Sequence, residues 1–500
     1  MLDLIIKGGQ VVTPDRVADL DIGIKDGLIV SVARPGAIEV EAGRTIDAAG
    51  KIVVPGGIEP HAHILSPIQR SWVRGDEELT QPPDAATRAA AFGGTTTVVD
   101  FAPAAAGVDP IEAVTNRRAQ FNGRAYIDYT FHCTLRGMVE DSVIARLGDA
   151  IKEGIASFKI FTTFGLPKRN PPMKVDDGHL WGVMTEVAKH GGIMAIHAED
   201  DEIVTYMEEK LKREGQDQWY NLHLAHNGLS EDVAFRKVLR IARNTGAGVY
   251  FVHVTAKEGV AAIAEARAAG MPVYGEALHN YLCFTCENYK ETDGGKYHTY
   301  PAIKEDADQA ALWNGLVGGA ISTVATDEYT TSYDTKTWGK TLETVCGGHA
   351  GIETRAMIAF SEGYMKGRYS LQRFVEVSSS NAAKILGMYP RKGAIAVGSD
   401  ADIAIWDPAT TKTVALSDLH HASDYSIWEG WTMRGWPVTT LLRGKVIVDG
   451  GRLLGSPTDG QWLPRRIAAE VLARPVCQRA VSSADALAWG VGAPVPGSTA

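Results

Sequence analysis

The sequence has few cysteines, no long apolar run and no excess of basic residues. Its five cysteines are scattered and odd in number, which favours reduced thiols in a cytoplasmic protein over a disulfide framework. No apolar run is long enough to span a bilayer, and the first residues lack the pattern of a signal peptide, so we expect no membrane partner. The formal net charge of −10 argues against nucleic acid as a partner, because phosphate binding needs a basic face.

The composition is that of an ordinary globular protein. Apolar residues make up 45% and charged residues 22%, which excludes disordered and fibrous classes. A length of 500 residues indicates one large domain with a satellite, or two domains. Cys283 and Cys286 form a Cys-x-x-Cys pair that could be half of a zinc site or a redox pair. No second pair completes such a site, so we interpret these residues as buried neutral thiols.

Both ends of the chain share one style of short β-rich runs separated by turns. Residues 22–30 hold an Asp-Gly turn between two such runs, and residues 440–450 have the pattern of another hairpin. We therefore predict that the two ends form one small sheet. Residues 456–500, rich in alanine, are expected to be a surface or subunit-contact tail.

The middle of the chain alternates short β-branched runs with alanine-rich helical stretches. Strands are expected at residues 95–100, 156–161, 193–197, 249–253 and 321–327, and helices at 258–269 and 306–315. Doubly buried strands that alternate with helices indicate a parallel α/β sheet, and the length suits a closed (β/α)₈ barrel. An open doubly wound sheet has the same alternation, so the positions of the polar residues decide between the two.

Residues that can bind a metal stand at the ends of these apolar runs. They are His61, His63, Lys159, His197, His253 and Asp327. Side chains two apart on a strand point the same way, so the first two histidines can chelate one ion. Barrel enzymes assemble their sites at the C-terminal strand ends, and imidazoles with a carboxylate suit zinc. A single strand-end histidine is more often hydrogen-bonded within a core, so the prediction depends on the whole set.

Lys159 is the unusual member of this set, because an ammonium group would repel a metal ion. Burial among Phe158, Ile160 and Phe161 would disfavour the charged form. A neutral lysine can react with carbon dioxide to give a carbamate, which behaves as a bridging carboxylate. The residues permit this chemistry without requiring it, and a lysine that reaches the surface is the alternative.

The sequence resembles the hydantoinase and dihydropyrimidinase branch of the amidohydrolase superfamily from residue 1 to about residue 450. The motifs that carry the resemblance are Pro55 to His63, Gly94 to Asp100, Ser157 to Lys159, Ile196 to Glu199, His253 to Thr255, Gly351 to Arg355, Tyr389 to Gly393 and Gly398 to Asp402. The resemblance implies a TIM barrel over 55–387 and a small β-sandwich built from 1–54 and 388–455. It also implies a homotetramer or homodimer that hydrolyses a hydantoin, a dihydropyrimidine or a related cyclic imide or ureide.

The resemblance further implies a role for each strand-end residue. His61, His63 and Asp327 would hold one divalent metal ion, and His197 and His253 would hold the other. A carboxylated Lys159 would bridge the two ions, for which the family implies zinc; manganese or cobalt would suit the same ligands. A hydroxide between the ions would attack the ring carbonyl. Asp327 would act first as base and then as acid, passing the water's proton to the leaving ring nitrogen.

Four positions expected to bind substrate depart from the pattern of the branch. Phe164 stands where a tyrosine hydroxyl usually helps hold the carbonyl oxygen, and losing such a donor costs on the order of 10²–10³ in turnover. Tyr300 replaces a serine, Tyr329 lies in a changed segment after Asp327, and Gly347 replaces an asparagine. We hypothesise that the ring is neither dihydrouracil nor a simple hydantoin, and that Tyr300 or Tyr329 supplies the missing hydroxyl. Alternatively, Phe164 only packs and a loop compensates.

Two other functions stay open at this level. A lactam, allantoin or dihydroorotate is the alternative ring; dihydroorotate would need a basic partner for its carboxylate, and Arg70 and Lys168 are candidates by position. The second alternative is a non-catalytic, dihydropyrimidinase-like scaffold. Such relatives have lost metal ligands, whereas all six positions are present here. Stoichiometric bound metal would separate an enzyme from a scaffold.

Overall fold

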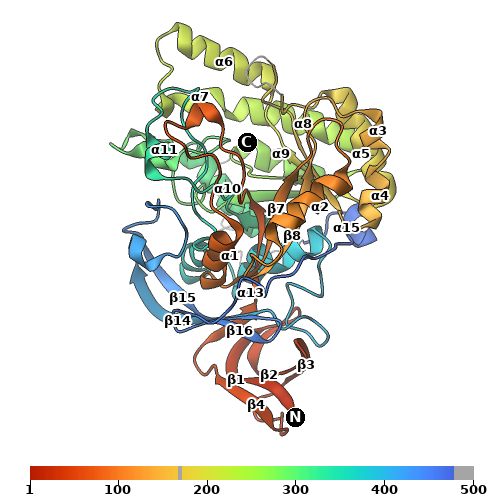
Figure 1. Cartoon of the computed structure of the whole chain (residues 1–500), viewed down its shortest axis with the longest axis vertical. Helices are drawn as coiled ribbons and strands as arrows, with labels where there is room; N and C mark the ends of the chain where they lie inside the picture. The colour runs from red at the N-terminus through yellow and green to blue at the C-terminus, as the bar shows by residue number, and fades with distance from the viewer. Residues whose placement is uncertain (167–171, 478–500) are drawn as a thin grey trace, which may run out of the picture.

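The barrel occupies most of the molecule, and the second sheet lies at one end of it with the N-terminus (Figure 1). The computed structural model describes residues 1–166 and 172–477. None of the helices within these ranges combines the length and the apolar character needed to cross a membrane. The five cysteines, all within the described part, have free thiols.

Eight parallel strands form the barrel. In order around it they are β6 (Gly57–Ala62), β7 (Thr95–Pro103), β8 (Asp128–Thr134), β9 (Ser157–Phe161), β10 (Ile193–His197), β11 (Gly248–Phe251), β12 (Val273–Leu278) and β13 (Ile321–Ala325). A parallel bridge between Ala62 and Glu328 links the end of the last strand to the first, and the His63 N–H donates to the Glu328 carbonyl at 2.7 Å. The sheet is therefore a nearly closed ring, which confirms the predicted (β/α)₈ barrel and excludes the open sheet.

Helices between the strands cover the outside of the barrel (Figure 1). The longer ones are α1 (Pro83–Phe92), α2 (Pro110–Phe121), α5 (Asp177–His190), α6 (Asp201–Arg213), α8 (Gly228–Thr245), α9 (Lys257–Ala268) and α10 (Asp306–Gly318). The shorter ones are α3 (Asp141–Ile144), α4 (Leu147–Lys152), α7 (Leu222–Ala225), α11 (Tyr333–Thr337), α12 (Arg355–Ile358), α13 (Leu371–Val375) and α14 (Asn381–Ile385). The helices predicted at 258–269 and 306–315 are confirmed as α9 and α10. Gly319, with φ of 87°, ends α10 in the left-handed conformation that glycine adopts without strain.

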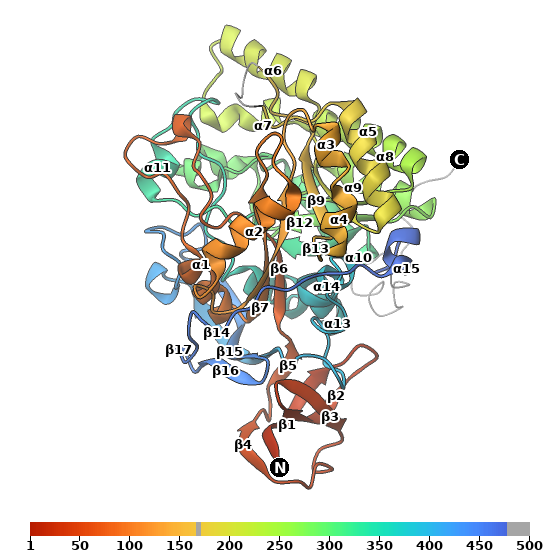
Figure 2. The same cartoon turned by 45° about the vertical axis from the view of Figure 1, so that its right-hand side comes forward.

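The second sheet combines both ends of the chain, as the sequence predicts. Its strands are β1 (Leu2–Val12), β2 (Val17–Lys25), β3 (Leu28–Ala33), β4 (Ala42–Asp47), β5 (Ile52–Pro55), β14 (Ile403–Thr413), β15 (Thr432–Leu442), β16 (Lys445–Asp449) and β17 (Arg452–Leu453). β5 pairs with both β1 and β14, and so joins the two halves. Apolar residues of both halves share one core, which gives the sandwich. Figure 2 shows β5 leading directly into the barrel strand β6.

The segment after β17 packs against the barrel. The Leu463 N–H donates to the Tyr129 carbonyl at 2.9 Å, and the buried Arg465 donates to Ser157 Oγ at 2.8 Å. The short helix α15 (Ala469–Ala473) follows, and its Val471 is buried in one hydrophobic cluster with Leu463. Residues as far as 477 therefore cover the first residues of β8 and β9. The remainder of the predicted tail, 478–500, lies outside the described residues.

Candidate metal and substrate site

A cavity of about 530 Å³ opens at the C-terminal ends of the barrel strands. All the residues predicted for the site line it, namely His61, His63, Lys159, Phe164, His197, His253, Tyr300, Asp327, Tyr329 and Gly347. Arg70 lines the cavity as well, whereas Lys168 lies outside the described residues. The barrel thus brings together residues that are as far apart in the sequence as His61 and Gly347.

Two histidines and an aspartate converge on one point of this cavity. Asp327 Oδ1 lies 3.0 Å from His61 Nε2 and 3.0 Å from His63 Nε2. The three residues offer ligand atoms that all lie within 4.8 Å of one another. His61 is in β6 and Asp327 stands two residues beyond the end of β13, next to the bridge that closes the barrel. Two imidazole nitrogens and a carboxylate oxygen form a donor set that suits a divalent metal ion.

The other two histidines lie beside each other, with ring centres 4.4 Å apart. His197 ends β10, and His253 stands two residues beyond β11. Burial lowers the pKa of His197 to about 4 and that of His253 well below its usual value. Both imidazoles are therefore neutral at physiological pH, which is the form that binds metal ions.

Lys159 lies between these groups, in the middle of β9 and not at its end. Its side chain is 1% exposed, and its Nζ lies 4.8 Å from the ring centre of Phe161 and 5.5 Å from that of Phe101. Burial lowers the pKa of Lys159 to about 7, against the attraction of Asp327 and Glu276. The surface-reaching alternative is excluded, and a neutral amine is accessible at this position.

Three non-glycine residues of the site have a left-handed backbone. The φ angles are 38° for His253, 51° for Asp327 and 64° for Phe164. Such conformations cost on the order of 1–3 kcal/mol and concentrate at functional sites, where the surrounding structure enforces them. Side-chain direction at these positions is therefore fixed by the fold.

Buried carboxylates hold the histidines in place. Glu276 of β12 accepts from His61 Nδ1 at 2.7 Å, from the Tyr250 hydroxyl at 2.5 Å and from the His253 N–H at 3.0 Å. The hydrogen bond from His61 Nδ1 to Glu276 fixes the His61 ring so that its Nε2 faces Asp327. Glu59 accepts from the His61 N–H at 2.9 Å and lies 3.0 Å from the buried Arg355. Sequence reasoning missed both glutamates, although an acidic residue inside an apolar strand was an available signal.

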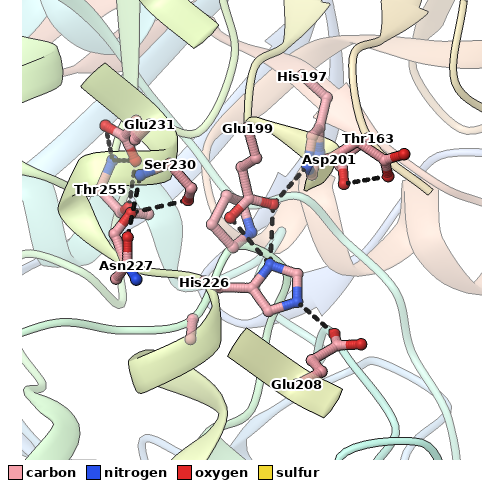
Figure 3. A network of polar contacts seen from close by, with 12 residues as sticks. Thr163, His197, Glu199, Asp201, Glu208, His226, Asn227, Ser230, Glu231 and Thr255 are labelled. Carbon is pink, nitrogen blue, oxygen red and sulfur yellow. Dashed lines mark hydrogen bonds and ion pairs between the residues drawn. The ribbon is translucent and has the colours of Figure 1, made fainter. Parts of the chain in front are cut away.

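A second carboxylate network orients His197 (Figure 3). Glu199 lies 2.8 Å from His197 Nε2 and 2.9 Å from His226 Nδ1. Glu208 lies 3.4 Å from the other nitrogen of His226. Against the effect of burial, the two histidines hold the pKa of Glu199 well below its usual range, so it stays a carboxylate. The network leaves Nδ1 as the nitrogen of His197 that can face a ligand.

One wall of the cavity is aromatic. The Phe164 ring lies 5.2 Å from that of His197 and 6.1 Å from that of Tyr300, and Tyr300 stacks on Trp72 at 5.4 Å with nearly parallel planes. The Tyr300 hydroxyl donates to the carbonyls of residues 342 and 345, at 3.4 and 3.3 Å. The Tyr329 hydroxyl donates to the carbonyl of residue 67 at 3.0 Å. Both hydroxyls are bonded to the main chain, which does not support the hypothesis that one replaces the missing donor at Phe164.

Comparison with known proteins places the chain in a family. The pattern of the amidohydrolase family matches residues 52–447. The chain is 37% identical to the D-hydantoinase of Rhizobium radiobacter over 93% of its length and 99% of that protein, and 31% identical to the dihydropyrimidinase of Rattus norvegicus over 95% and 91%. A solved D-hydantoinase structure superposes with a TM-score of 0.86 at 36% identity, over 93% of this chain and 99% of that one.

The chain belongs to the amidohydrolase family. Within that family it is a member of the branch of the D-hydantoinases and dihydropyrimidinases, as the motifs in the sequence predict.

Proposed function

We propose that the chain is a metal-dependent hydrolase that opens a ring amide. Its substrate class is that of hydantoins, dihydropyrimidines and related cyclic imides or ureides. The observation that carries the proposal is the convergence of four histidines, a buried lysine and an aspartate in one cavity, within a chain whose relatives are D-hydantoinases and a dihydropyrimidinase. A non-catalytic scaffold would not need this set of metal-binding side chains.

His61, His63 and Asp327 would hold one divalent ion, and His197 and His253 a second. Lys159, as a carbamate, would lie between the two. Zinc is the ion we expect, because imidazole and carboxylate ligands suit it. The bound ions would supply the Lewis acidity that activates water and polarises the ring carbonyl. The neutral state of the two buried histidines and the burial of Lys159 support this assignment.

The remaining steps fall to the protein's own groups. The Asp327 carboxylate would take a proton from the attacking water and deliver it to the ring nitrogen that leaves. Its left-handed backbone fixes the direction of this carboxylate. Phe164, Tyr300, Tyr329 and Gly347 would form the surface on which the ring lies, with the rings of Phe164 and Tyr300 as apolar walls. These walls offer no hydroxyl to the carbonyl oxygen, so the metal site would carry that charge.

The organisation around the site is part of the same proposal. The sandwich would comprise 1–54 and 388–455, the catalytic barrel 55–387, and 456–500 would contribute to a subunit contact. The protein would act in the cytoplasm as a homotetramer or homodimer. Light scattering of the purified chain, with and without residues 478–500, tests the assembly and the role of the tail.

Hydrolysis of a panel of rings tests the function. The metal-loaded protein is given dihydrouracil, hydantoin, substituted hydantoins, a succinimide, a lactam and allantoin, and ring opening is followed by chromatography. We expect opening of at least one ureide or imide ring, and its loss in Lys159→Ala. Activity confined to the lactam would move the substrate class, and no opening of any ring by a metal-loaded protein would contradict the proposal.

A further inference from the structure

Arg136 stands on the rim of the cavity, next to the strand that carries Lys159. It follows β8, whose last residue Thr134 pairs with Lys159 in the parallel ladder. The Leu135 N–H donates to the Lys159 carbonyl at 2.9 Å and holds the chain in register beyond the strand end. Thr134 and Arg136 line the cavity, whereas Leu135 between them points into the core. The arginine is thus presented to the cavity by the barrel itself.

The Arg136 guanidinium has no anionic partner among residues 1–166 and 172–477. Its Nε is buried without a hydrogen bond, and burial alone lowers the pKa of the group, with no carboxylate acting on it. The sequence of 167–171, Pro-Lys-Arg-Asn-Pro, contains no acidic residue that could pair with it. Other buried arginines have acceptors: Arg117 lies 2.7 Å from Asp100, and Arg465, which has no carboxylate partner, donates to Thr130 and Ser157 at 2.9 and 2.8 Å. Arg136 is therefore an exception that needs an explanation.

The described residues of the cavity wall include no free carboxylate that could pair with Arg136. Asp327 is the one carboxylate among the described lining residues, and it is already engaged by His61 and His63. The other lining arginine, Arg70, is exposed and donates to the Gly75 carbonyl at 3.0 Å. Arg136 is partly buried and its Nε has no acceptor, which is costly, and an anionic ligand would offset that cost. The planar fork of an arginine matches a carboxylate with two parallel hydrogen bonds.

We propose that Arg136 binds a carboxylate substituent of the substrate, so that the preferred substrate is a cyclic amide with a carboxylate on a short side chain. The inference rests on the proposed function of the site and narrows its substrate class. The reacting amide would lie at Asp327 and the histidines, and the substituent would extend toward the end of β8. A neutral side chain of the same shape would leave Arg136 unpaired, so the site would discriminate against it.

The test compares two matched rings that differ in charge alone. One is a hydantoin with a carboxyethyl group on its ring carbon, and the other carries a carbamoylethyl group. Binding is measured by titration calorimetry and hydrolysis by chromatography, for the metal-loaded wild type and for Arg136→Met, Arg136→Lys and Arg70→Met. Thermal unfolding of each variant controls for folding.

The wild type is expected to prefer the carboxylate ring by about 10- to 100-fold in both Kd and kcat/KM. Arg136→Met should abolish this preference and Arg136→Lys should keep part of it. Loss of the preference in Arg70→Met, with the preference kept in Arg136→Met, would assign the carboxylate to the other lining arginine and overturn the proposal. Equal binding of the two rings by the wild type would overturn the proposal. An equal loss of kcat/KM for both rings in Arg136→Met would also overturn it. Arg136 would then act on the carboxylate that ring opening creates in every product, and not on the substituent. Calorimetry reports the preference without turnover, so a wild type that prefers the carboxylate ring and hydrolyses neither ring would support the role of Arg136, while the ring panel decides the proposed function.

Discussion

A Cβ atom on Gly347 would lie 2.4 Å from Cδ2 of Tyr300, so these two residues share one volume at the wall of the cavity. The hydantoinase pattern has an asparagine at the position of Gly347 and a serine at that of Tyr300. The larger side chain of the pair therefore stands at the first position in the pattern and at the second position here. Here the tyrosine ring fills the space that a side chain at Gly347 would need, and it stacks on Trp72. The two departures from the pattern are therefore one coupled change in the shape of the substrate surface.

Gly347→Asn should destabilise the protein by about 1–3 kcal/mol, because it overpacks the wall against Tyr300. Adding Tyr300→Ser should recover most of that loss, since the serine vacates the shared volume. Denaturant unfolding of the single and double variants measures the coupling. Strictly additive effects of the two substitutions would show that the residues do not share this space in solution.

Phe164→Tyr should raise the turnover of dihydrouracil or hydantoin by on the order of 10²–10³ if the missing hydroxyl limits these rings. We expect this gain because the hydroxyls of Tyr300 and Tyr329 donate to main-chain carbonyls and so do not replace the missing donor. The control is Phe164→Leu, which changes the ring without adding a donor. No gain over wild type in the tyrosine variant would mean that the shape of the wall, and not the donor, restricts the substrate.

Glu276→Gln should lower metal affinity by about 10–100-fold, because the glutamate fixes the ring of His61 through Nδ1. Competition with a chelator of known affinity measures this effect. Tyr250→Phe is the matched control: it removes one hydrogen bond to Glu276 and leaves the bond to His61. The tyrosine variant should lose much less affinity, and an equal loss in both would assign the effect to general disturbance of β12.

Lys159 should take up label from isotope-labelled bicarbonate during reconstitution with metal, as a carbamate on its Nζ. Burial favours the neutral amine that this reaction needs. Carbon NMR of the reconstituted protein detects the carbamate. Lys159→Arg, which stays cationic, should show no signal. A signal that persists in this variant would place the label on another group.

The barrel and the paired chain ends were predictable because their signals are local. Doubly buried strands leave apolar runs such as 193–197, and the turn at Asp26 and Gly27 is written in a dipeptide whose residues adopt φ of 51° and 77°. The strand-end histidines follow from the same logic. Strand limits were less accurate: Lys159 lies inside β9, while His253 and Asp327 stand two residues beyond their strands. The left-handed backbone at the last two depends on tertiary contacts that no local pattern encodes.

The residues that sequence reasoning missed act through partners that are far away in the chain. Glu276 lies 215 residues from His61, and only the closed barrel brings the two within hydrogen-bonding distance. Arg136 follows β8, and no sequence motif marks it as a site residue. Its lack of a partner is a property of the folded cavity. The coupling of Gly347 with Tyr300 is likewise a matter of shape. These features require three-dimensional packing, which the sequence pattern does not show.

The metal content of the purified protein tests most directly whether four histidines, Lys159 and Asp327 form a two-metal site. Elemental analysis of the wild type, of His197→Asn and of Arg70→Met as a control should give two equivalents per chain for the wild type and the control. One equivalent or less is expected for His197→Asn. Protein that carries no stoichiometric metal after reconstitution would contradict the account and favour a non-catalytic scaffold.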